Sequence, residues 1–495
     1  MNLANKLVEM NNRIPNKYCI IQNERKITFK ELYNSSADFK CYLQQKGIKK
    51  GQKVLILVPM SIELYVSLFA IWSIGAIPCF MDAGFIKNGM KNNEFNDISC
   101  IIGVSKYILY SKINQNLRKL NLKINVNIID KLNYKREFNV CELEDNFPGI
   151  YTYTSGTTGK PKIAARTHEF LDIQGKIIYE NGDYEESDIE LSTMPIFTLS
   201  NINVGITTVI ADGKFSELGK SKPQKLIKQI KEHNINRVMA APGVLGVICN
   251  YCKNNNITMS SVNKVMTGGG AVFLDLINKL KDVFPYAEIT TAYGSTEAEP
   301  IAKLVVSNLS QEYIDKIKSG YGIPAGRVVG VEDCKIINTD KDEIGNISKQ
   351  EFINIQTNGV GEIVVTGKNV LKGYIGGVGD KENKFSVDGN IYHRTGDMGF
   401  FDGNGELWLR GRKKEPYFNV EAALHAYYSI SRTAALKEDD KLILVFEKGC
   451  NLDIQDILEK INFEKIDEIK YVDEIPTDKR HNSKVDYNEL RKILK

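Results

Sequence analysis

The stretch VLILVPMSIELYVSLFAIWSIGAIPCFM, residues 54–81, decides the fold of this chain. Two short apolar runs, Val54–Val58 and Ile77–Met81, flank a longer apolar run at Ile62–Ile74. A glycine and a proline interrupt the region, so it predicts a buried helix followed by a turn and a strand rather than a membrane-spanning helix. Strand, helix and strand in this order predict a βαβ unit, in which the two strands pair in parallel.

The same alternation continues on both sides of this unit. A helix is expected before it at Phe29–Lys46, and a second region with apolar strands and Lys-rich helical segments follows at about 191–288. The expected strands of that region are Val204–Ala211, Arg237–Ala241 and Lys264–Thr267. Both regions suggest open, mostly parallel sheets with helices on their faces.

The character of the sequence changes after Tyr321, where short strands, turns and glycines predominate. In FFDGNGELWLRGR, residues 400–412, the turn at Gly403–Gly405 joins two apolar runs, which is typical of a hairpin. Past Arg412 a small α+β piece ends in an expected helix at Tyr487–Lys495. We therefore expect an α/β fold: residues 1–411 form a large N-terminal body of two mostly parallel α/β subdomains plus a small β-rich subdomain, and residues 412–495 form a small mobile α+β C-terminal domain.

Composition places the chain among ordinary globular proteins. Of its 495 residues, 42% are apolar and 25% are charged, which argues against a disordered or fibrous chain. The 65 basic and 61 acidic residues leave a net charge of only +4, so no nucleic-acid partner is implied. Nine cysteines are scattered without the spacing of a disulfide scaffold, which indicates reduced thiols and a cytoplasmic location. We expect neither a secretory signal nor a membrane span.

The segment YTYTSGTTGKPK, Tyr151–Lys162, carries the sharpest chemical signal. Its hydroxyls, glycines and lysines make a flexible loop of hydrogen-bond donors and positive charge that can wrap a triphosphate. It is not a Walker loop, because the G-x-x-x-x-G-K-[ST] spacing fails. A solvated turn rich in glycine and threonine is the alternative interpretation.

A second segment, TAYGSTEAEP at Thr291–Pro300, combines an aromatic ring with a hydroxyl and a carboxylate. Tyr293 could stack on a purine, Thr296 could hold a phosphate oxygen and Glu297 could bind Mg²⁺. Read alone, the segment is equally compatible with a surface turn.

Two further positions complete the candidate site. In YHRTGDMGF, residues 392–400, a glycine turn presents Asp397, whose carboxylate suits the two hydroxyls of a ribose, and Arg412 follows on the next apolar run. Lys484 lies in RHNSKVDY near the end of the chain. Each also has an ordinary explanation, since Asp397 could simply cap a turn and Lys484 could be a solvated surface lysine.

In this order and spacing, the segments resemble the adenylate-forming superfamily of acyl-CoA synthetases, peptide-synthetase adenylation domains and luciferases. The resemblance runs from ITFKELY, residues 27–33, to SKVDY, residues 483–487, and TSGTTGKPK is its most specific part. It implies an enzyme that uses ATP and Mg²⁺ to convert a small-molecule carboxylic acid into an acyl-adenylate with release of pyrophosphate.

The resemblance also implies roles for individual residues. The phosphates would contact the loop residues Thr154, Ser155, Gly156, Thr157, Thr158 and Lys160. Tyr293 would stack on adenine, with Gly269 and Gly294 in the same nucleotide site, and Asp397 and Arg412 would hold the ribose. The expected catalytic residues are Thr296 on the α-phosphate, Glu297 as the Mg²⁺ ligand, and Lys484 bridging the substrate carboxylate and the α-phosphate. Lys414 lies where the family keeps its hinge between domains.

The branch of the family is less defined. PIFTLSNINVGITTVI, residues 195–210, and YGSTEAEPIA, residues 293–302, resemble the β-lactone synthetase of olefin biosynthesis and the fatty-acid–CoA ligase group. No acidic residue follows Phe197, which makes an α-amino acid substrate less suitable because its buried ammonium would be unpaired.

Three hypotheses stay open for the acyl group. After adenylation the enzyme transfers a fatty or hydroxy-acyl group to CoA or a carrier protein, as in fatty acid metabolism, or it cyclises a β-hydroxy acid to a β-lactone, or the chain is a non-catalytic nucleotide-binding relic. The segment after Arg412 lacks the glycine-containing loop usual in the family, which puts the transfer to a thiol in question.

Overall fold

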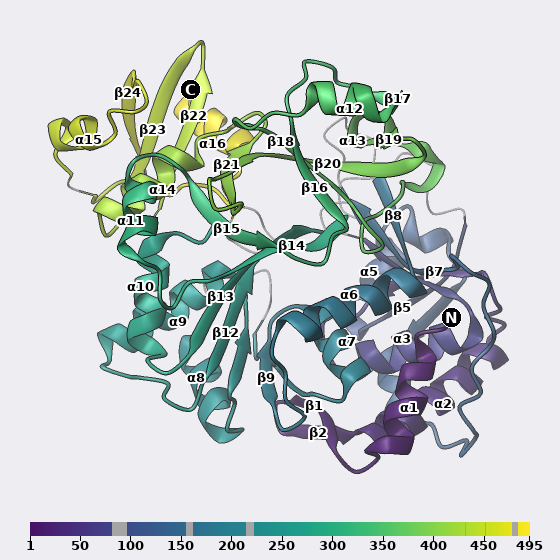
Figure 1. Cartoon of the computed structure of the whole chain (residues 1–495). Helices are drawn as coiled ribbons and strands as arrows, with labels where there is room; N and C mark the ends of the chain where they lie inside the picture. The colour runs from purple at the N-terminus through teal and green to yellow at the C-terminus, as the bar shows by residue number, and fades with distance from the viewer. Residues whose placement is uncertain (82–96, 155–161, 214–221, 431, 451, 478–483) are drawn as a thin grey trace. The chain divides into compact units, whose positions relative to one another are not determined.

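The computed structural model describes residues 1–81, 97–154, 162–213, 222–430, 432–450, 452–477 and 484–495 (Figure 1). The chain divides into two compact units. The first comprises Met1–Ile210 together with Leu371–Lys381, and the second comprises Ala211–Val370 together with Glu382–Lys495.

The first unit is built around a six-stranded sheet with the order β6-β5-β3-β4-β7-β8. All neighbouring pairs are parallel except β7 and β8. In the same unit β9, β10 and β1 pair in parallel, and β2 is antiparallel to β1. In chain order the elements are α1 (Ala4–Arg13), β1 (Tyr18–Gln22), β2 (Arg25–Thr28), α2 (Phe29–Gln45), β3 (Lys53–Leu57), α3 (Ile62–Ile74), β4 (Ile77–Met81), β5 (Ile98–Gly103), α5 (Ser105–Ile113), η1 (Leu117–Lys119), β6 (Leu122–Asn125), η2 (Val126–Lys131), β7 (Pro148–Thr154), β8 (Lys162–Thr167), α6 (His168–Asn181), β9 (Ile189–Ser192), α7 (Pro195–Val204), β10 (Thr207–Ile210) and η4 (Ile375–Gly377).

The βαβ unit predicted from residues 54–81 is present as β3, α3 and β4, with β3 and β4 parallel. Helix α3 is buried along nearly its whole circumference, which explains why its sequence is apolar on every face. The Ser61 side chain accepts a hydrogen bond from the Leu64 N–H at its start. Gly75 ends it in the left-handed conformation at φ 79°, and a Cβ there would lie 2.8 Å from Cys141 Sγ, so glycine is required.

The second unit combines a parallel segment with an antiparallel one. Strands β11, β12 and β13 pair in parallel, and an antiparallel series then runs through β14, β15, β21, β20, β18 and β16. Its elements are α8 (Pro223–Glu232), β11 (Arg237–Met239), α9 (Pro242–Asn254), β12 (Lys264–Gly268), α10 (Leu274–Val283), β13 (Glu288–Ser295), β14 (Ala298–Val305), α11 (Gln311–Lys318), β15 (Ile323–Val328), β16 (Asp333–Ile337), β17 (Gly345–Ile347), α12 (Lys349–Ile355), β18 (Gly361–Thr366), β19 (Lys384–Val387), β20 (Asn390–Phe401), β21 (Leu407–Arg412), α14 (Phe418–Tyr427), β22 (Thr433–Glu438), β23 (Lys441–Glu447), α15 (Ile454–Lys460), β24 (Glu468–Val472) and α16 (Tyr487–Leu494). The short helix α13 (Asp380–Asn383) spans the boundary in sequence between the two units.

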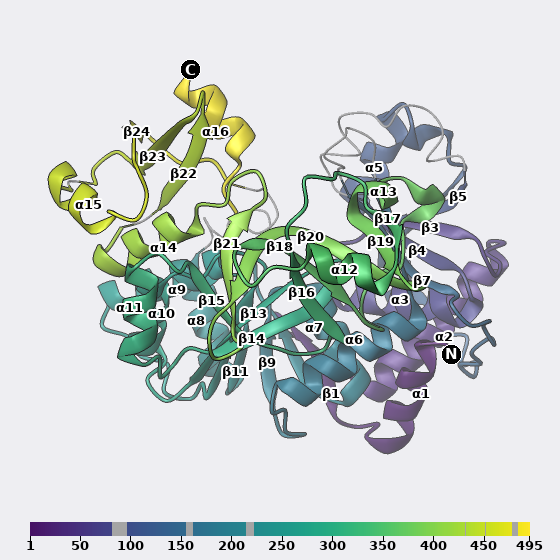
Figure 2. The same cartoon turned by 45° about the horizontal axis from the view of Figure 1, so that its top comes forward.

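The residues after Arg412 form a small α+β region with a three-stranded sheet of its own, β22-β23-β24. Figure 2 shows α14, α15 and α16 grouped around this sheet. Two apolar clusters, one centred on Leu424 and Leu444 and the other on Ile443 and Leu490, contain only residues from 417 onward. A core made from one stretch of chain supports a separate C-terminal domain at residues 412–495, which we retain as a proposal.

The predicted fold class is confirmed, and one of the strands named above was placed wrongly. Parallel-rich α/β sheets and a small α+β C-terminal region are both present. The strand expected at Val204–Ala211 was wrong in its first residues, because helix α7 continues to Val204 and Gly205 ends it at φ 89°. Strand β10 begins only at Thr207. Among the described residues, no helix combines the length and the apolar character that crossing a membrane requires.

Candidate active site

The segment YGSTEAEP forms a tight hairpin between β13 and β14. Ser295 pairs with Ala298, so Thr296 and Glu297 are the two turn residues at its tip. The Glu297 N–H donates to Ser295 Oγ at 3.3 Å. At Gly294 a Cβ would lie only 2.9 Å from the carbonyl oxygen of Ala298, which explains the glycine between the aromatic ring and the turn. The hairpin therefore places Thr296 and Glu297 next to each other at its tip.

Gly269 lies at the edge of the sheet where the parallel strands end. It follows β12 directly and adopts a left-handed conformation at φ 79°. Gly268 pairs with Ala292 on β13, so Gly269 and Tyr293 each come one residue after a paired position. Ligands of open α/β sheets bind at the carboxyl ends of the strands, and Gly269 lies at the carboxyl end of β12.

Two of the predicted site residues bond to the carboxylate of a third. The Tyr293 hydroxyl donates to Asp397 Oδ2 at 2.9 Å, and Arg412 Nη1 donates to Asp397 Oδ1 at 2.8 Å. Asp397 and Arg412 are also directly opposed on β20 and β21. The Arg412 side chain remains 58% exposed, so the group lies at the surface of the unit and is accessible to a ligand.

The charges around Arg412 strengthen this arrangement. Burial and the neighbouring Asp397 carboxylate raise the pKa of Tyr293 well above its usual range, so its hydroxyl keeps its proton and remains a donor. Partial burial opposes the charged form of Arg412, but the carboxylates of Asp397 and Glu297 raise the pKa of its guanidinium. Glu297 at the hairpin tip therefore lies within the electrostatic range of Arg412, although these residues are far apart in sequence.

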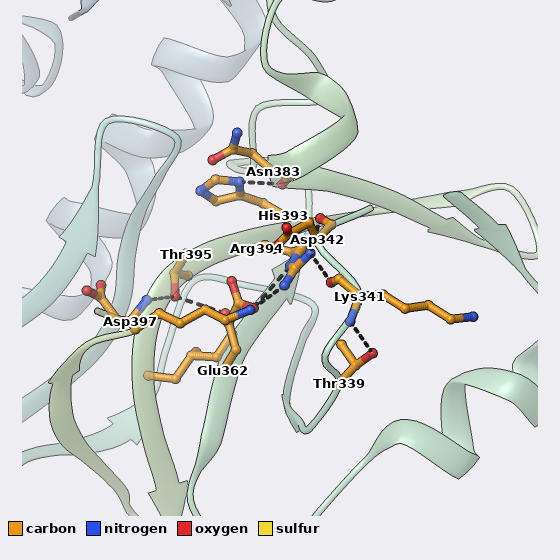
Figure 3. Close-up of polar contacts among 11 residues, drawn as sticks. Thr339, Lys341, Asp342, Glu362, Asn383, His393, Arg394, Thr395 and Asp397 are labelled. Atoms are coloured by element: carbon orange, nitrogen blue, oxygen red, sulfur yellow. Dashed lines mark hydrogen bonds and ion pairs between the residues drawn. The ribbon is translucent and has the colours of Figure 1, made fainter. Parts of the chain in front are cut away.

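Thr395 holds Asp397 in place and was not predicted as a site residue. Its Oγ1 accepts a hydrogen bond from the Asp397 N–H at 3.1 Å and donates to the Ile363 carbonyl at 2.9 Å. Its carbonyl oxygen accepts from Arg412 Nη1 at 3.3 Å. Figure 3 shows Thr395 and Asp397 on the same strand, β20. The sequence offered one signal, because Thr395 is part of the YHRTGDMGF segment that drew attention to Asp397.

A buried ion pair lies beside this carboxylate. Arg394 Nη2 and Nε contact Glu362 Oε2 at 2.5 and 3.1 Å, and the two side chains are only 3% and 7% exposed. Arg394 Nη1 also donates to the carbonyl oxygens of Lys341 and Asp342 (Figure 3). Lys413 Nζ, one residue beyond Arg412, lies 3.5 Å from Glu362 Oε2. No local pattern predicts this pair, because Glu362 comes from the neighbouring strand β18.

The predicted triphosphate loop joins β7 to β8. Its residues Ser155, Gly156, Thr157, Thr158 and Lys160 lie outside the described residues, and their predicted role stays a prediction. Thr154, the last residue of β7, pairs with Lys162, the first residue of β8. The Lys162 side chain is buried, with Nζ 5.4 Å from the centre of the Tyr374 ring.

Lys484 is placed by the C-terminal region of the second unit. It is exposed and lies three residues before the first residue of α16. The next residue, Val485, forms a β-bridge with Thr477, and the Asp486 N–H donates to the Pro476 carbonyl at 2.8 Å. The structure therefore brings Tyr293, Asp397 and Arg412 together and places Lys484 in the segment just before α16.

The donor set near the hairpin fits a magnesium ion bound together with phosphates. Among the described residues, no group of three or more His, Cys, Asp or Glu side chains could hold a metal ion by itself. Mg²⁺ commonly takes one or two protein carboxylates and completes its shell with phosphate oxygens and water. Glu297 offers one such carboxylate. A separate surface cavity of about 320 Å³, lined by residues that include Tyr321, Arg410 and Phe463, contains none of the predicted site residues.

Comparison with known proteins identifies the family. Residues 8–375, most of the chain, match the model of the family described as AMP-binding enzyme. Among curated proteins, an olefin beta-lactone synthetase of Stenotrophomonas maltophilia is 24% identical over 78% of this chain and 74% of its own length. A 4-coumarate-CoA ligase of Narcissus pseudonarcissus is 25% identical over 80% of this chain and 73% of its own length.

Solved structures agree on the fold. The O-succinylbenzoate coenzyme A synthetase from Bacillus subtilis, in complex with ATP and a magnesium ion, superposes with a TM-score of 0.76 at 19% identity, covering 98% of this chain and 99% of the other. The predicted resemblance and the predicted class of enzyme, an acyl-adenylate-forming ligase, are confirmed. The chain belongs to the AMP-binding enzyme family, which is the adenylate-forming superfamily.

Proposed function

We propose that this enzyme uses ATP and Mg²⁺ to activate a fatty or hydroxy-acyl carboxylic acid as its acyl-adenylate, with release of pyrophosphate, and then transfers the acyl group to the thiol of CoA or of a carrier protein. The observation that carries the proposal is the convergence of Tyr293, Asp397 and Arg412 in a chain whose residues 8–375 match the AMP-binding enzyme model. The relatives named as CoA ligases and the neighbour bound to ATP and magnesium support the same choice of substrates.

The nucleoside part of ATP fits the three converging residues. A carboxylate oxygen accepts more than one hydrogen bond, so Asp397 can bond the ribose hydroxyls while Arg412 and Tyr293 hold it in place. The Tyr293 ring remains available for stacking on adenine. The loop between β7 and β8 contributes hydroxyls and lysines for the phosphates, and Gly269 and Gly294 let the backbone approach the nucleotide closely.

Catalysis requires charge compensation at the α-phosphorus. The substrate carboxylate attacks this atom in line as pyrophosphate leaves, and two anions must meet for the bond to form. Magnesium, when bound, offsets the negative charge of the phosphates. Glu297 would ligand the ion, the Thr296 hydroxyl would bond an oxygen of the α-phosphate, and Lys484 would place its ammonium between the carboxylate and the α-phosphate.

The test is ATP–pyrophosphate exchange measured over a panel of carboxylic acids. Exchange that depends on one class of acid supports the proposal, and the absence of exchange with every acid, while ATP still binds, would instead support a non-catalytic nucleotide-binding protein. Lys484→Ala should lower exchange by about a hundredfold or more, because it removes charge that acts only in the transition state, while the Kd for ATP changes less than about threefold. Survival of exchange in this variant would contradict the role of Lys484.

A second candidate is cyclisation of a β-hydroxy acid to a β-lactone. It is favoured by the sequence likeness to curated olefin beta-lactone synthetases. In that reaction the β-hydroxyl oxygen attacks the acyl carbon of the adenylate, AMP leaves, and the hydroxyl proton is released. AMP release from a β-hydroxy acid without any thiol, with a product lighter than the substrate by one water, would select this reaction. AMP release that requires CoA or a carrier protein would select transfer to a thiol.

We also propose a cytoplasmic location. All nine cysteines are free, and most are buried. Burial raises the pKa of several, including Cys79 and Cys334, to about 12, which keeps them as unreactive thiols. Reduced structural cysteines are typical of proteins in a reducing compartment.

A further inference from the structure

A very short segment of chain joins Lys484 to helix α16. Only Val485 and Asp486 separate the lysine from Tyr487, the first residue of the helix. The Asp486 side chain caps the helix by accepting a hydrogen bond from the Glu489 N–H at 3.1 Å. With so few residues between them, the orientation of the helix largely determines where the lysine side chain can reach.

The start of α16 is bonded to a buried carboxyl group on another helix. The Tyr487 hydroxyl contacts Glu421 Oε1 at 3.0 Å, and the same oxygen accepts from the Ala435 N–H at 2.9 Å. Glu421 lies on α14 and is only 2% exposed, and Ala435 lies on β22. A single carboxyl group thus joins α14, β22 and α16.

The middle of α16 is bonded to the segment that follows the nucleotide site. Arg491 Nη2 pairs with Glu415 Oε1, and it also lies 3.4 Å from the Lys437 carbonyl oxygen. Glu415 is 5% exposed, and its N–H donates to the Arg412 carbonyl at 2.8 Å. Arg412 itself bonds Asp397, so a series of contacts runs from the proposed ribose site to the helix that carries the lysine segment.

We propose that helix α16 is a positioning element for Lys484, held in place by two partly buried side-chain contacts, one at Tyr487 and one at Arg491. The inference rests on the proposed acid-activating function and extends it, because it assigns a role in adenylation to residues that touch neither ATP nor the acid. Glu421 is the partner of Tyr487, and Glu415 is the partner of Arg491. These four residues are positioning residues, because each acts on the reaction through Lys484.

The chemistry of the two contacts explains why they suit this task. Burial raises the pKa of Glu421 to about 8, and the nearby Glu415 carboxylate acts in the same direction. Near neutral pH Glu421 is therefore mostly protonated, and the contact with Tyr487 is a neutral hydrogen bond. The Glu415 and Arg491 contact, by contrast, is charge-assisted and buried on the Glu415 side, where Oε2 has no hydrogen-bond partner among the described residues. A shift of α16 would break both contacts, so the helix has one preferred position.

The test combines kinetics with amide hydrogen exchange on the full-length enzyme. Tyr487→Phe removes one hydroxyl and Arg491→Ala removes the ion pair. For each we expect kcat of ATP–pyrophosphate exchange to fall about tenfold, while KM for ATP changes less than about twofold, because the nucleotide contacts are intact. In the same variants the amides of residues 484–495 should exchange with solvent about tenfold faster. Glu421→Gln, which keeps an acceptor oxygen for Tyr487, should retain most of the activity.

Two matched controls come from the same region. Tyr471→Phe removes a hydroxyl from β24, and Lys492→Ala removes an exposed ion pair with Glu489 on the same helix. Neither should change kcat or amide exchange. If Tyr487→Phe and Arg491→Ala leave the amides of 484–495 as protected as in the parent enzyme, the inference is wrong. The same holds if those amides lose protection while kcat stays unchanged. If the parent enzyme shows no ATP–pyrophosphate exchange with any acid in the panel, the proposed function is refuted instead. Amide protection would then still report whether the two contacts hold α16.

Discussion

At the scale of single residues, Asp397 links a tyrosine and an arginine that the chain supplies from two other strands. Asp397→Asn keeps the size of the side chain but removes its charge, so Arg412 loses its ion-pair partner and a ribose loses a charged acceptor. We expect ATP to bind about tenfold to a hundredfold more weakly, which corresponds to the loss of one or two charge-assisted hydrogen bonds. Titration calorimetry with ATP measures the effect.

The control for this substitution is Asp388→Asn. Asp388 is exposed in the turn before β20 and has a left-handed backbone at φ 46°, a conformation that asparagine also tolerates. Its affinity for ATP should match that of the parent enzyme. Equal losses in both variants would mean that Asp397 acts through general charge rather than through contact with the nucleotide.

The buried pair of Arg394 and Glu362 affects stability rather than chemistry. Glu362→Ala leaves a guanidinium buried with only backbone carbonyl oxygens as partners, and we expect the free energy of unfolding to fall by about 3 kcal/mol. Urea denaturation followed by fluorescence measures this loss. Asp473→Ala, which breaks the exposed pair with Lys448, should cost less than about 1 kcal/mol. Similar losses in the two variants would argue against an important role for the buried pair.

At the scale of elements, the local sequence predicted the bounds of a helix or strand best where residues of that same segment determine them. Helix α3 begins and ends at the predicted residues because Ser61, a continuous apolar run and Gly75 define it completely. The start of β10 was misjudged because α7 is itself buried and apolar, so periodicity could not separate the helix from the strand.

The bond between Tyr293 and Asp397 joins residues 104 positions apart, and no local pattern determines which distant strands meet. The sequence thus indicated the candidate site residues by type, whereas the contacts of Thr395 and Glu362 became visible only in the assembled sheet.

The pH dependence of stability also belongs to this scale, because Glu421 connects three elements. Its pKa is raised in the folded protein to about 8, so the folded state favours the protonated form, and this contribution is lost as the pH rises from the ordinary carboxyl range through 8. The groups that act on Glu421 are Ala435 N–H, Tyr487 and Glu415, with Arg491 next to Tyr487.

Glu421→Gln removes this titration while keeping an acceptor. Between pH 6 and pH 9 the parent enzyme should lose on the order of 2 kcal/mol more stability than the variant does. Thermal unfolding at a series of pH values, with matched ionic strength, provides the comparison. Parallel pH profiles for the two proteins would show that Glu421 titrates in its ordinary range and that the buried environment does not shift it.

At the scale of the whole molecule, one short linker separates two groups along the sequence. The residues proposed to bind the nucleotide come before it, and the proposed catalytic lysine comes after it. Tyr293, Asp397 and Arg412 precede the linker at residues 413–417, and Lys484 follows it. Two glycines inserted after Lys414 leave the side-chain hydrogen bonds among Tyr293, Asp397 and Arg412 in place but lengthen and loosen the path to the lysine. We expect the Kd for AMP to stay within about twofold and kcat of pyrophosphate exchange to fall about tenfold to a hundredfold, because positioning contributes to the rate and not to ground-state binding.

The same insertion in the exposed turn at Asp439 and Asp440, within the C-terminal region, should leave both quantities unchanged. Full exchange activity with the longer linker would mean that adenylation does not depend on how residues 412–495 are held, and the proposed role of Lys484 would have to be abandoned.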